Sequence, residues 1–328
     1  MSRNVRIAVG VLISVAALYL AIPPRSEWAA VANAFRDVNY LYIIPLAILS
    51  AYSIFIRAQR WQLLLRPIGE VALLPLVSAT SIGFLCNMIL PLRVGEIVRP
   101  VLLARRSQQP LSSVLASVVL ERLLDMLTIL AFLGIVIATI PVSDVIRSSG
   151  LAFVVVAVIA IALILALQRR NAVAVGMVEA VIQRLPAAVR QRAEPALHDF
   201  IEGLQSVRGG EGLWKIGLYS LYLWGIIASI FGLGFVACGL PVPTVVGSLA
   251  MVAVVAGAVS APSAPGFIGT FQAGCVLALA LFGVGRADAI PYAFVIWAVQ
   301  WLTQVILGVV FVLRENISFQ DLQSVETE

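Results

Sequence analysis

Residues 87–100 read NMILPLRVGEIVRP, and this stretch decides how the chain must fold. It lies in an apolar segment, 73–106, that a proline, a glycine and several charges interrupt. A second interrupted apolar segment, 245–282, centres on residues 260–272, which read SAPSAPGFIGTFQ. In lipid every backbone N–H and C=O needs an internal partner, so irregular backbone survives only under protein or along a wet cavity. We therefore predict two broken, re-entrant helical hairpins, which in corresponding halves of a chain point to a transporter's binding site.

The composition is that of a membrane protein. The 328 residues are 61% hydrophobic and 12% charged, with a mean hydropathy of +1.02. Soluble domains carry about 25% charged residues, so we predict an all-α integral membrane protein that forms one transmembrane domain over residues 1–328. The three cysteines, Cys86, Cys238 and Cys275, lie in apolar runs and are expected to be buried free thiols.

Six apolar runs approach or exceed the roughly 20 residues that cross about 30 Å of hydrocarbon. The predicted spans are 5–22, 40–65, 113–140, 150–167, 214–238 and 289–313. The first hairpin lies between the second and third spans, and the second hairpin between the fifth and sixth. No small-residue cleavage site directly follows the run 5–22, so we expect it to be retained as the first span.

The basic residues predict the orientation in the membrane. If each hairpin enters and leaves on one side, most of the 22 basic residues fall on connectors that share a side. The connectors of the opposite side carry only Arg25, Arg36, Arg147 and Arg286. The positive-inside rule then places both termini in the cytoplasm and predicts a multi-pass protein of the cell membrane.

This order of elements has an internal symmetry. Residues 1–140 and 141–328 each give span, span, hairpin, span, but they start on opposite sides of the membrane. We predict an inverted-topology repeat, although two unrelated broken helix pairs would share that order by coincidence. The connector 168–213 alternates apolar and charged residues at a helical period, which predicts amphipathic helices on the cytoplasmic face.

Charged residues within the apolar segments indicate the site. Glu121 and Asp125 are spaced i, i+4 and share a helix face, while Arg122 and Asp125, spaced i, i+3, can pair. Charges inside a membrane usually face a cavity or one another. The structural alternative is an ion cluster that only ties this span to the arginines of the first hairpin.

Arginines near the first break suggest an anion. Arg93, Glu96 and Arg99 follow Pro91 at helical spacing, and a helix that begins there would offer free N–H groups to phosphate. The arginine fork suits phosphate as well. Arg57 and Arg60 either join this site or form a snorkelling belt. The candidate substrate-binding residues are Arg57, Arg60, Asn87, Arg93, Glu96, Arg99, Glu121, Arg122, Asp125 and Gln272, and the hairpin-break residues are Pro91, Gly95, Pro262, Pro265, Gly266 and Gly269.

Four motifs occur in a recognisable order along the chain. They are Arg57-x-x-Arg60-Trp61, Asn87-x3-Pro91-x-Arg93-x-Gly95-Glu96-x-x-Arg99, Glu121-Arg122-x-x-Asp125 and Pro262-x-x-Pro265-Gly266-x-x-Gly269. Over essentially the whole chain this set resembles the lysylphosphatidylglycerol synthase transmembrane region, a flippase-like family.

That resemblance implies a membrane domain that moves a phospholipid which an appended cytosolic domain synthesises. We expect the synthase domain to be absent, because the chain ends at Glu328. Family members often carry an acidic residue where Gln272 stands and a basic residue where Ile296 and Trp297 stand, so the substrate is expected to differ.

The favoured function is a lipid translocase that moves a phospholipid or isoprenoid-phosphate lipid through a polar cavity between the hairpins. A proton gradient is the expected drive, since no phosphate-binding loop for ATP is present. The alternatives are an intramembrane lipid-modifying enzyme, with Glu121 and Asp125 in acid–base roles, and a scaffold for a partner glycosyl- or acyltransferase. We expect no enzyme activity, because the spans lack histidine and a nucleophile elbow. We also expect no cofactor, no metal and no nucleic-acid partner.

Overall fold

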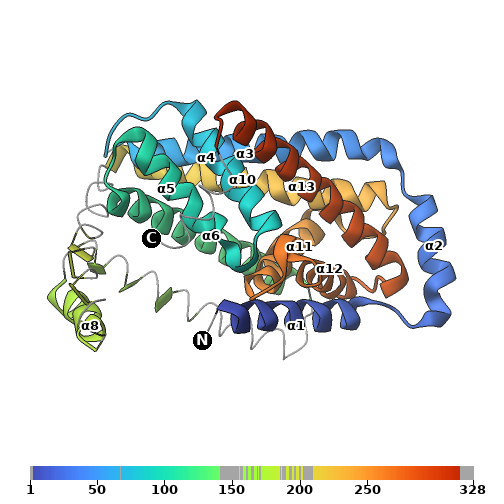
Figure 1. The fold of residues 1–328 in the computed structure, drawn as a ribbon. Coiled ribbons are helices and arrows are strands. Elements are labelled where there is room, and N and C mark those ends of the chain that lie inside the picture. The colour runs from blue at the N-terminus through green and yellow to red at the C-terminus, as the bar shows by residue number, and fades with distance from the viewer. Residues whose placement is uncertain are drawn as a thin grey trace.

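The computed structural model describes residues 3–66, 68–140, 171–184 and 210–317, with scattered residues between 155 and 201. All regular elements in these residues are helices, which confirms the predicted all-α class (Figure 1). The α-helices are α1 (Arg3–Ala21), α2 (Trp28–Asp37), α3 (Ile43–Leu65), α4 (Leu73–Ile89), α5 (Gly95–Ser107), α6 (Leu111–Thr139), α8 (Ala172–Ile182), α10 (Gly210–Ala237), α11 (Thr244–Ser260), α12 (Thr270–Ala280) and α13 (Arg286–Arg314). Four short 3-10 helices are η1 (Arg25–Glu27), η2 (Tyr40–Tyr42), η3 (Pro91–Arg93) and η4 (Pro265–Phe267).

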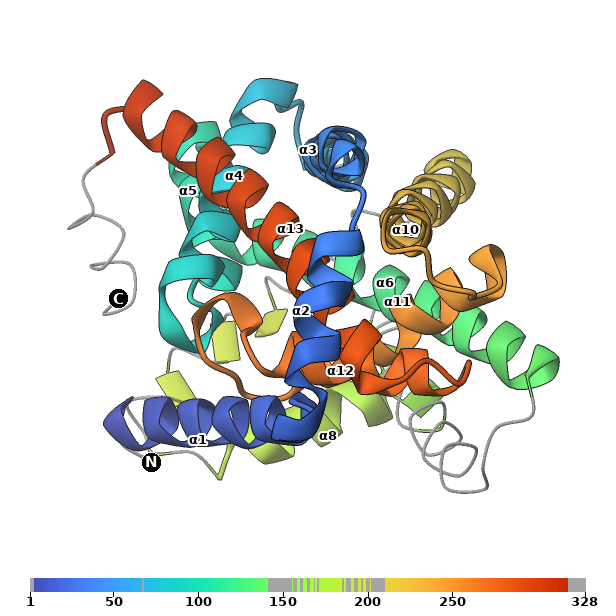
Figure 2. The same cartoon turned by 90° about the vertical axis from the view of Figure 1, so that its right-hand side faces the viewer.

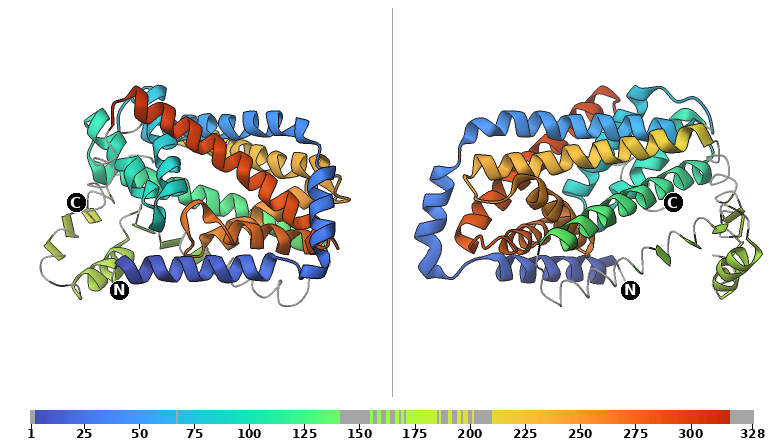
Figure 3. Two further views of the ribbon diagram at one scale, coloured as in Figure 1. Left: turned by 45° about the vertical axis from the view of Figure 1, so that its right-hand side comes forward. Right: turned by 180° about the vertical axis from the view of Figure 1, so that it is seen from behind.

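Four long helices are apolar enough to cross a membrane, and each matches a predicted span. They are Tyr40–Leu65, Leu111–Thr139, Trp214–Ala237 and Arg286–Arg314. The first three run side by side in the right-hand view of Figure 3, where α13 crosses behind them. The predicted count of six is not reached in the described part of the chain, because most of the predicted span 150–167 lies outside it.

The first predicted span, 5–22, corresponds to α1, but the helical segment after it was not predicted. Residues 8–21 and 25–37 form two helices bent by 61° at the Pro23-Pro24 break, and they make a fifth candidate span only if taken together. The second of these, α2, lies across one end of the bundle (Figures 1 and 2). Trp28 at its start is 58% exposed, which suits an interfacial helix.

Proline sets both hairpin breaks. The residue before a proline avoids the helical region, and Leu90 before Pro91 is extended, with φ −94° and ψ 146°. Ala264 before Pro265 is extended in the same way, with φ −63° and ψ 162°. Each break then contains a non-glycine residue with positive φ, which is Arg93 (55°) in η3 and Phe267 (58°) in η4. Such backbone is uncommon and concentrates at functional sites.

The two arms of each hairpin pack closely, as the segments 73–106 and 245–282 predict. In the first hairpin, α4 and α5 touch through their backbones, and a Cβ on Gly95 would lie 1.8 Å from the carbonyl oxygen of Gly83. The second hairpin pairs α11 with α12. The tips η3 and η4 also contact each other. Re-entry into the bilayer from one side stays a prediction.

Two apolar clusters form the core, and each draws residues from both halves of the chain. One consists mainly of α3, α4, α5 and the first part of α6, with the buried Trp61, and also includes residues of α8. The other consists mainly of α10 to α13, with Phe235 and Tyr292 stacked at 5.3 Å, and also includes Leu46 of α3 and Phe132 of α6. The predicted repeat of residues 1–140 and 141–328 stays a prediction, because most of its span 150–167 lies outside the described residues. Of the predicted amphipathic connector, the structure describes chiefly α8, at the edge of the bundle (Figure 1).

The helix α1 packs across the second hairpin break. The Ser14 hydroxyl accepts a hydrogen bond from the backbone N–H of Ala264 at 2.7 Å. Gly269 has φ 88°, and a Cβ there would lie 2.1 Å from the carbonyl oxygen of Ser14. A glycine is therefore required at position 269 both for its backbone conformation and for this close approach.

We expect Gly269→Ala to destabilise the protein by roughly 2 to 4 kcal/mol, because it combines a left-handed backbone cost with overpacking against α1. Gly257→Ala is the matched control, since no atom lies within 4 Å of a Cβ there and its backbone is helical. Thermal unfolding in detergent measures both. A Gly269→Ala midpoint equal to that of the control would contradict the close approach of α1.

Candidate functional site

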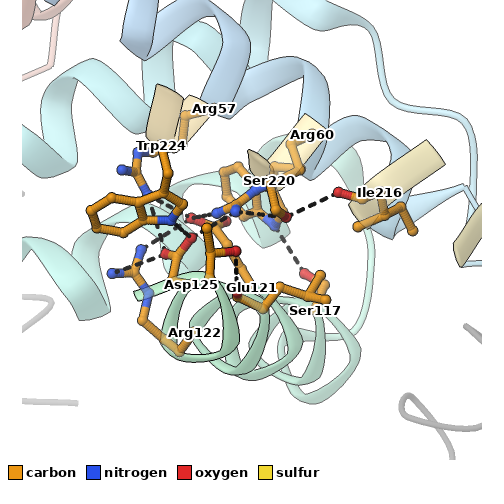
Figure 4. Close-up of polar contacts among 12 residues, drawn as sticks. Arg57, Arg60, Ser117, Glu121, Arg122, Asp125, Ile216, Ser220 and Trp224 are labelled. Carbon is orange, nitrogen blue, oxygen red and sulfur yellow. Dashed lines mark hydrogen bonds and ion pairs between the residues drawn. The ribbon is translucent and has the colours of Figure 1, made fainter. Parts of the chain in front are cut away.

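Three helices, α3, α5 and α6, bring the charged residues together. Arg57 and Arg60 lie on α3, and Glu121 and Asp125 share one face of α6. Figure 4 shows the arginines of α3 pointing at both carboxylates. Arg99 reaches Glu121 from α5. Glu121 is the eleventh residue of α6, about 15 Å along a helix from its start, so the charges lie well inside the bundle.

Glu121 is fully buried and touches four guanidinium groups. Its Oε1 accepts from Arg57 at 3.2 Å, Arg99 at 3.0 Å and Arg122 at 3.0 Å. Arg60 lies 3.2 Å from the same oxygen, and Oε2 accepts a second bond from Arg99 at 2.9 Å. The Arg99 contact is therefore bidentate, which is the strongest geometry for such a pair.

Asp125, one turn further along α6, is the second anchor. Its Oδ1 accepts from Arg60 at 2.6 Å and from the indole N–H of Trp224 on α10 at 2.9 Å. Its Oδ2 lies 3.5 Å from Arg57 and 3.8 Å from Arg122. Asp125 thus links α3 and α6 to α10.

A further layer of contacts fixes the arginines in place. The Arg99 guanidinium lies 3.9 Å from the centre of the Trp61 ring, a close cation–π contact. The Trp61 indole donates to the Ser117 hydroxyl at 2.9 Å, and Ser220 accepts from Arg60 at 3.1 Å. We call Arg57, Arg60, Arg99, Glu121 and Asp125 the inner cluster.

Three partly exposed charges lie beside the inner cluster, and we call them the outer set. Arg122 and Glu96 have side chains 45% and 39% exposed and lie 3.9 Å apart. Arg93 lies 5.1 Å over the ring of Phe267, so the tips of the two hairpins meet through this cation–π contact. One terminal nitrogen of Arg93, Nη2, is buried without a hydrogen-bond partner among the described residues.

Positive charge is in excess in both groups. In the described residues, three arginines of the inner cluster face two carboxylates, and two arginines of the outer set face one. An unpaired charge inside a bilayer is expensive and usually marks a substrate or ion site. The arrangement therefore suits an anion of one or two charges, held by the arginines that remain partly exposed.

A cavity of about 220 Å³ adjoins the inner cluster. Arg57 and Trp224 line it on the cluster side, and Phe267 lines it at the tip of the second hairpin. Most of the remaining wall is apolar, with Phe84, Ile227 and Val255 as examples. A mostly apolar pocket with a few convergent polar groups is the usual form of a ligand site.

The wall formed by α13 contains residues that the sequence reasoning did not propose. Trp297, Gln300, Trp301 and Gln304 all line the cavity. The Trp297 indole donates to the carbonyl oxygen of Gly266 at 2.7 Å, which attaches α13 to the second hairpin break. The sequence did contain a signal for this face, because two indoles and two amides, each pair spaced i, i+4, stand inside a predicted span.

An apolar groove lies next to this cavity, between α2, α3 and α13. Its volume is about 550 Å³, and it is lined by residues such as Phe35, Ile43 and Leu302. Trp297 lines both the groove and the cavity, so the two spaces are neighbours.

The structure brings together eight of the predicted site residues in the inner cluster and the outer set. Arg57 and Arg60 are 8% and 0% exposed, which excludes the snorkelling alternative. The helix α5 begins at Gly95, one turn later than expected, because η3 occupies residues 91–93. The N–H groups of Ile97 and Val98 donate to Val94, so they are not free for an anion.

The other two predicted residues lie at the hairpins. Asn87 packs against Gly95, and its Oδ1 is buried without a hydrogen-bond partner in the described structure. Gln272 caps α12, since its Oε1 accepts from the N–H of Gly269 at 2.7 Å. It is not in contact with the inner cluster, and its part in substrate binding stays a prediction.

Comparison with known proteins gives a family and one distant relative. A family model described as the lysylphosphatidylglycerol synthase TM region matches residues 7–308. Glycosyltransferase AglD of Haloferax volcanii is 26% identical over 348 residues, covering 97% of this chain and 55% of the relative. The chain thus spans about half the length of that relative. No solved structure matches.

The relative corrects one expectation. We expected no enzyme activity because no familiar catalytic motif is present, but a match over almost the whole chain to a protein named as a glycosyltransferase contradicts this. The expectation failed because the absence of a familiar nucleophile elbow or metal-ligand motif does not exclude an enzyme.

Removal of the central carboxylate should be costly. We expect Glu121→Gln to destabilise the protein by roughly 3 to 5 kcal/mol, because it leaves buried arginines without their partner. Glu96→Gln is the control, since its 3.9 Å contact is partly exposed and is worth about 1 kcal/mol or less. The thermal midpoints of the purified variants in detergent compare the two, and equal midpoints would contradict a structural role for the inner cluster.

Proposed function

The chain belongs to the family of the lysylphosphatidylglycerol synthase transmembrane region, and from that premise we propose that it binds a membrane lipid by its phosphate and carries the headgroup across the bilayer. The observation that carries this proposal is the excess of positive charge beside a cavity, within helices long and apolar enough to span a membrane. A phosphodiester or phosphomonoester supplies the negative charge that the site lacks.

The outer set is the part of the site available to a ligand. Arg122 already gives one nitrogen to Glu121 at 3.0 Å, yet nearly half of its side chain is exposed. Arg93 has an unpartnered nitrogen and lies against Phe267, which lines the cavity. These two arginines hold the phosphate, and the inner cluster keeps the helices in position around it.

The size of the cavity supports a headgroup ligand. Its volume of about 220 Å³ is below the roughly 300 to 1,000 Å³ of pockets for drug-sized ligands. A whole lipid does not fit, so the acyl or isoprenoid tails stay outside. The apolar groove beside Trp297 would hold those tails, because it adjoins the cavity and its lining is almost wholly apolar.

Movement across the bilayer follows from the meeting of the hairpin tips. If the halves are an inverted repeat, one hairpin gives access from each side, and the contact between Arg93 and Phe267 separates the two openings. In the predicted orientation, with both termini in the cytoplasm of a cell-membrane protein, the inner cluster lies toward the cytoplasmic side. A proton gradient is the proposed drive.

A second candidate function rests on the relative alone. The name of that glycosyltransferase favours a part in the transfer of a glycosyl group, and the apolar helices favour a membrane lipid as the partner in that transfer. The cavity would then hold the lipid while its phosphate reacts. Appearance of a glycosylated lipid when the purified protein is given a sugar nucleotide and a polyprenyl phosphate would favour this candidate over translocation.

Translocation is measured in proteoliposomes that carry a fluorescent phosphate lipid in one leaflet, to which a membrane-impermeant quencher is added. Wild type should lose signal at least about ten-fold faster than Arg93→Gln/Arg122→Gln, which lacks two charge-assisted contacts. Arg106→Gln is the matched control, since that arginine pairs with Glu315 away from the site. The proposal would be contradicted if liposomes with the wild-type protein lost signal no faster than empty liposomes, for several headgroups and with an imposed proton gradient.

A further inference from the structure

One face of α13 presents two indoles and two amides to the cavity. Trp297 and Trp301 are stacked, with ring centres 6.0 Å apart, and Gln300 and Gln304 lie one helical turn apart beside them. Neither glutamine belongs to the inner cluster or the outer set. The proposed binding of a phosphate therefore leaves this face without a role.

The amides carry buried atoms that lack partners. Gln300 Nε2 and Gln304 Oε1 are both buried, and neither has a hydrogen-bond partner in the described part of the chain. Buried polar atoms in native proteins are almost always paired, and they are more costly unpaired where no water can reach them. A donor and an acceptor left open on one face indicate a ligand group that offers both.

The chemistry of these atoms selects among headgroups. An ionised phosphate only accepts hydrogen bonds and an ammonium group only donates them, whereas a hydroxyl does both. The indoles of Trp297 and Trp301 add apolar ring surface against which the C–H face of a sugar packs. The volume of about 220 Å³ corresponds to roughly seven water molecules, which suits one monosaccharide and not an oligosaccharide.

We propose that the face of α13 formed by Trp297, Gln300, Trp301 and Gln304 is a subsite for a neutral, hydroxyl-bearing headgroup, such as a single sugar, attached to the lipid phosphate. This inference rests on the proposed function, because the outer set must hold that phosphate. Phe267, over whose ring Arg93 of the outer set lies, lines the same cavity as the glutamines, so the phosphate site and the sugar subsite are neighbours.

The test compares two probes that differ by one sugar. A fluorescent polyprenyl phosphate bound to the purified protein is displaced by unlabelled polyprenyl phosphate or by the same lipid phosphate carrying one hexose. Wild type should prefer the glycosylated probe by roughly ten-fold, as two added hydrogen bonds would give. Gln300→Leu/Gln304→Leu should lose that preference and bind the bare phosphate lipid as wild type does.

The variant should fold, because leucine replaces two unpaired amides by apolar groups of similar size, and its thermal midpoint should equal or exceed that of wild type. Ser229→Ala is the control, since Ser229 is polar, exposed on α10 and lines neither the cavity nor the groove. An equal affinity of wild type for both probes would overturn the sugar subsite and leave the proposed phosphate binding intact. An equal loss of affinity for both probes in the double leucine variant would also overturn the subsite, because the glutamines would then contribute to phosphate binding and not to sugar binding. Failure of wild type to bind either probe would overturn the proposed function and this inference with it.

Discussion

The contact on which the rest of the structure depends is a single buried carboxylate, Glu121, in the midst of four guanidinium groups. A buried charge is tolerated only when partners surround it, and here those partners come from α3, α5 and α6 itself. Asp125 extends the same network to α10 through the indole of Trp224. Because these helices share one set of ion pairs, none of them moves alone, and the wall of the cavity at Arg57 and Trp224 is fixed by the same contacts.

The hairpin tips are the second constraint. Arg93 and Phe267 are both non-glycine residues with positive φ, and they meet each other across the two halves of the chain. Strained backbone persists where surrounding contacts over-determine it, and it is often part of a switching element. A ligand that takes the Arg93 guanidinium away from the Phe267 ring would separate the tips. In the proposed function, phosphate binding and the opening of the cavity would be coupled through Arg93.

The spacing of residues along the sequence predicted much of the site, whereas the features that depend on tertiary packing could not be predicted from it. The i, i+4 relation of Glu121 and Asp125 placed them on one face, and the X-Pro rule located both hairpin breaks. The burial of Arg57 and Arg60 could not be read from α3 alone, because the same sequence suits a snorkelling belt until α5, α6 and α10 cover it. The cap formed by Gln272 could have been predicted, because a glutamine three residues after the N-cap residue Gly269 has the spacing of a capping box. The polar face of α13 was missed because two glutamines scarcely disturb an apolar span.

The expectation that the chain lacks enzyme activity failed for a related reason, and its correction leaves the central claim unchanged. Translocation and glycosyl transfer both require a lipid phosphate held in the cavity beside the inner cluster. The most direct measurement is photo-crosslinking in liposomes with a phosphate lipid that carries a diazirine in its headgroup, followed by mass spectrometry of the labelled peptides. The predicted result is labels on residues that line the cavity, namely Gly266, Phe267, Phe271, Trp297, Gln300, Trp301 and Gln304. Labels confined to outward residues of α3 such as Ile44 and Ile48 would contradict the account, because the headgroup would then never leave the lipid surface.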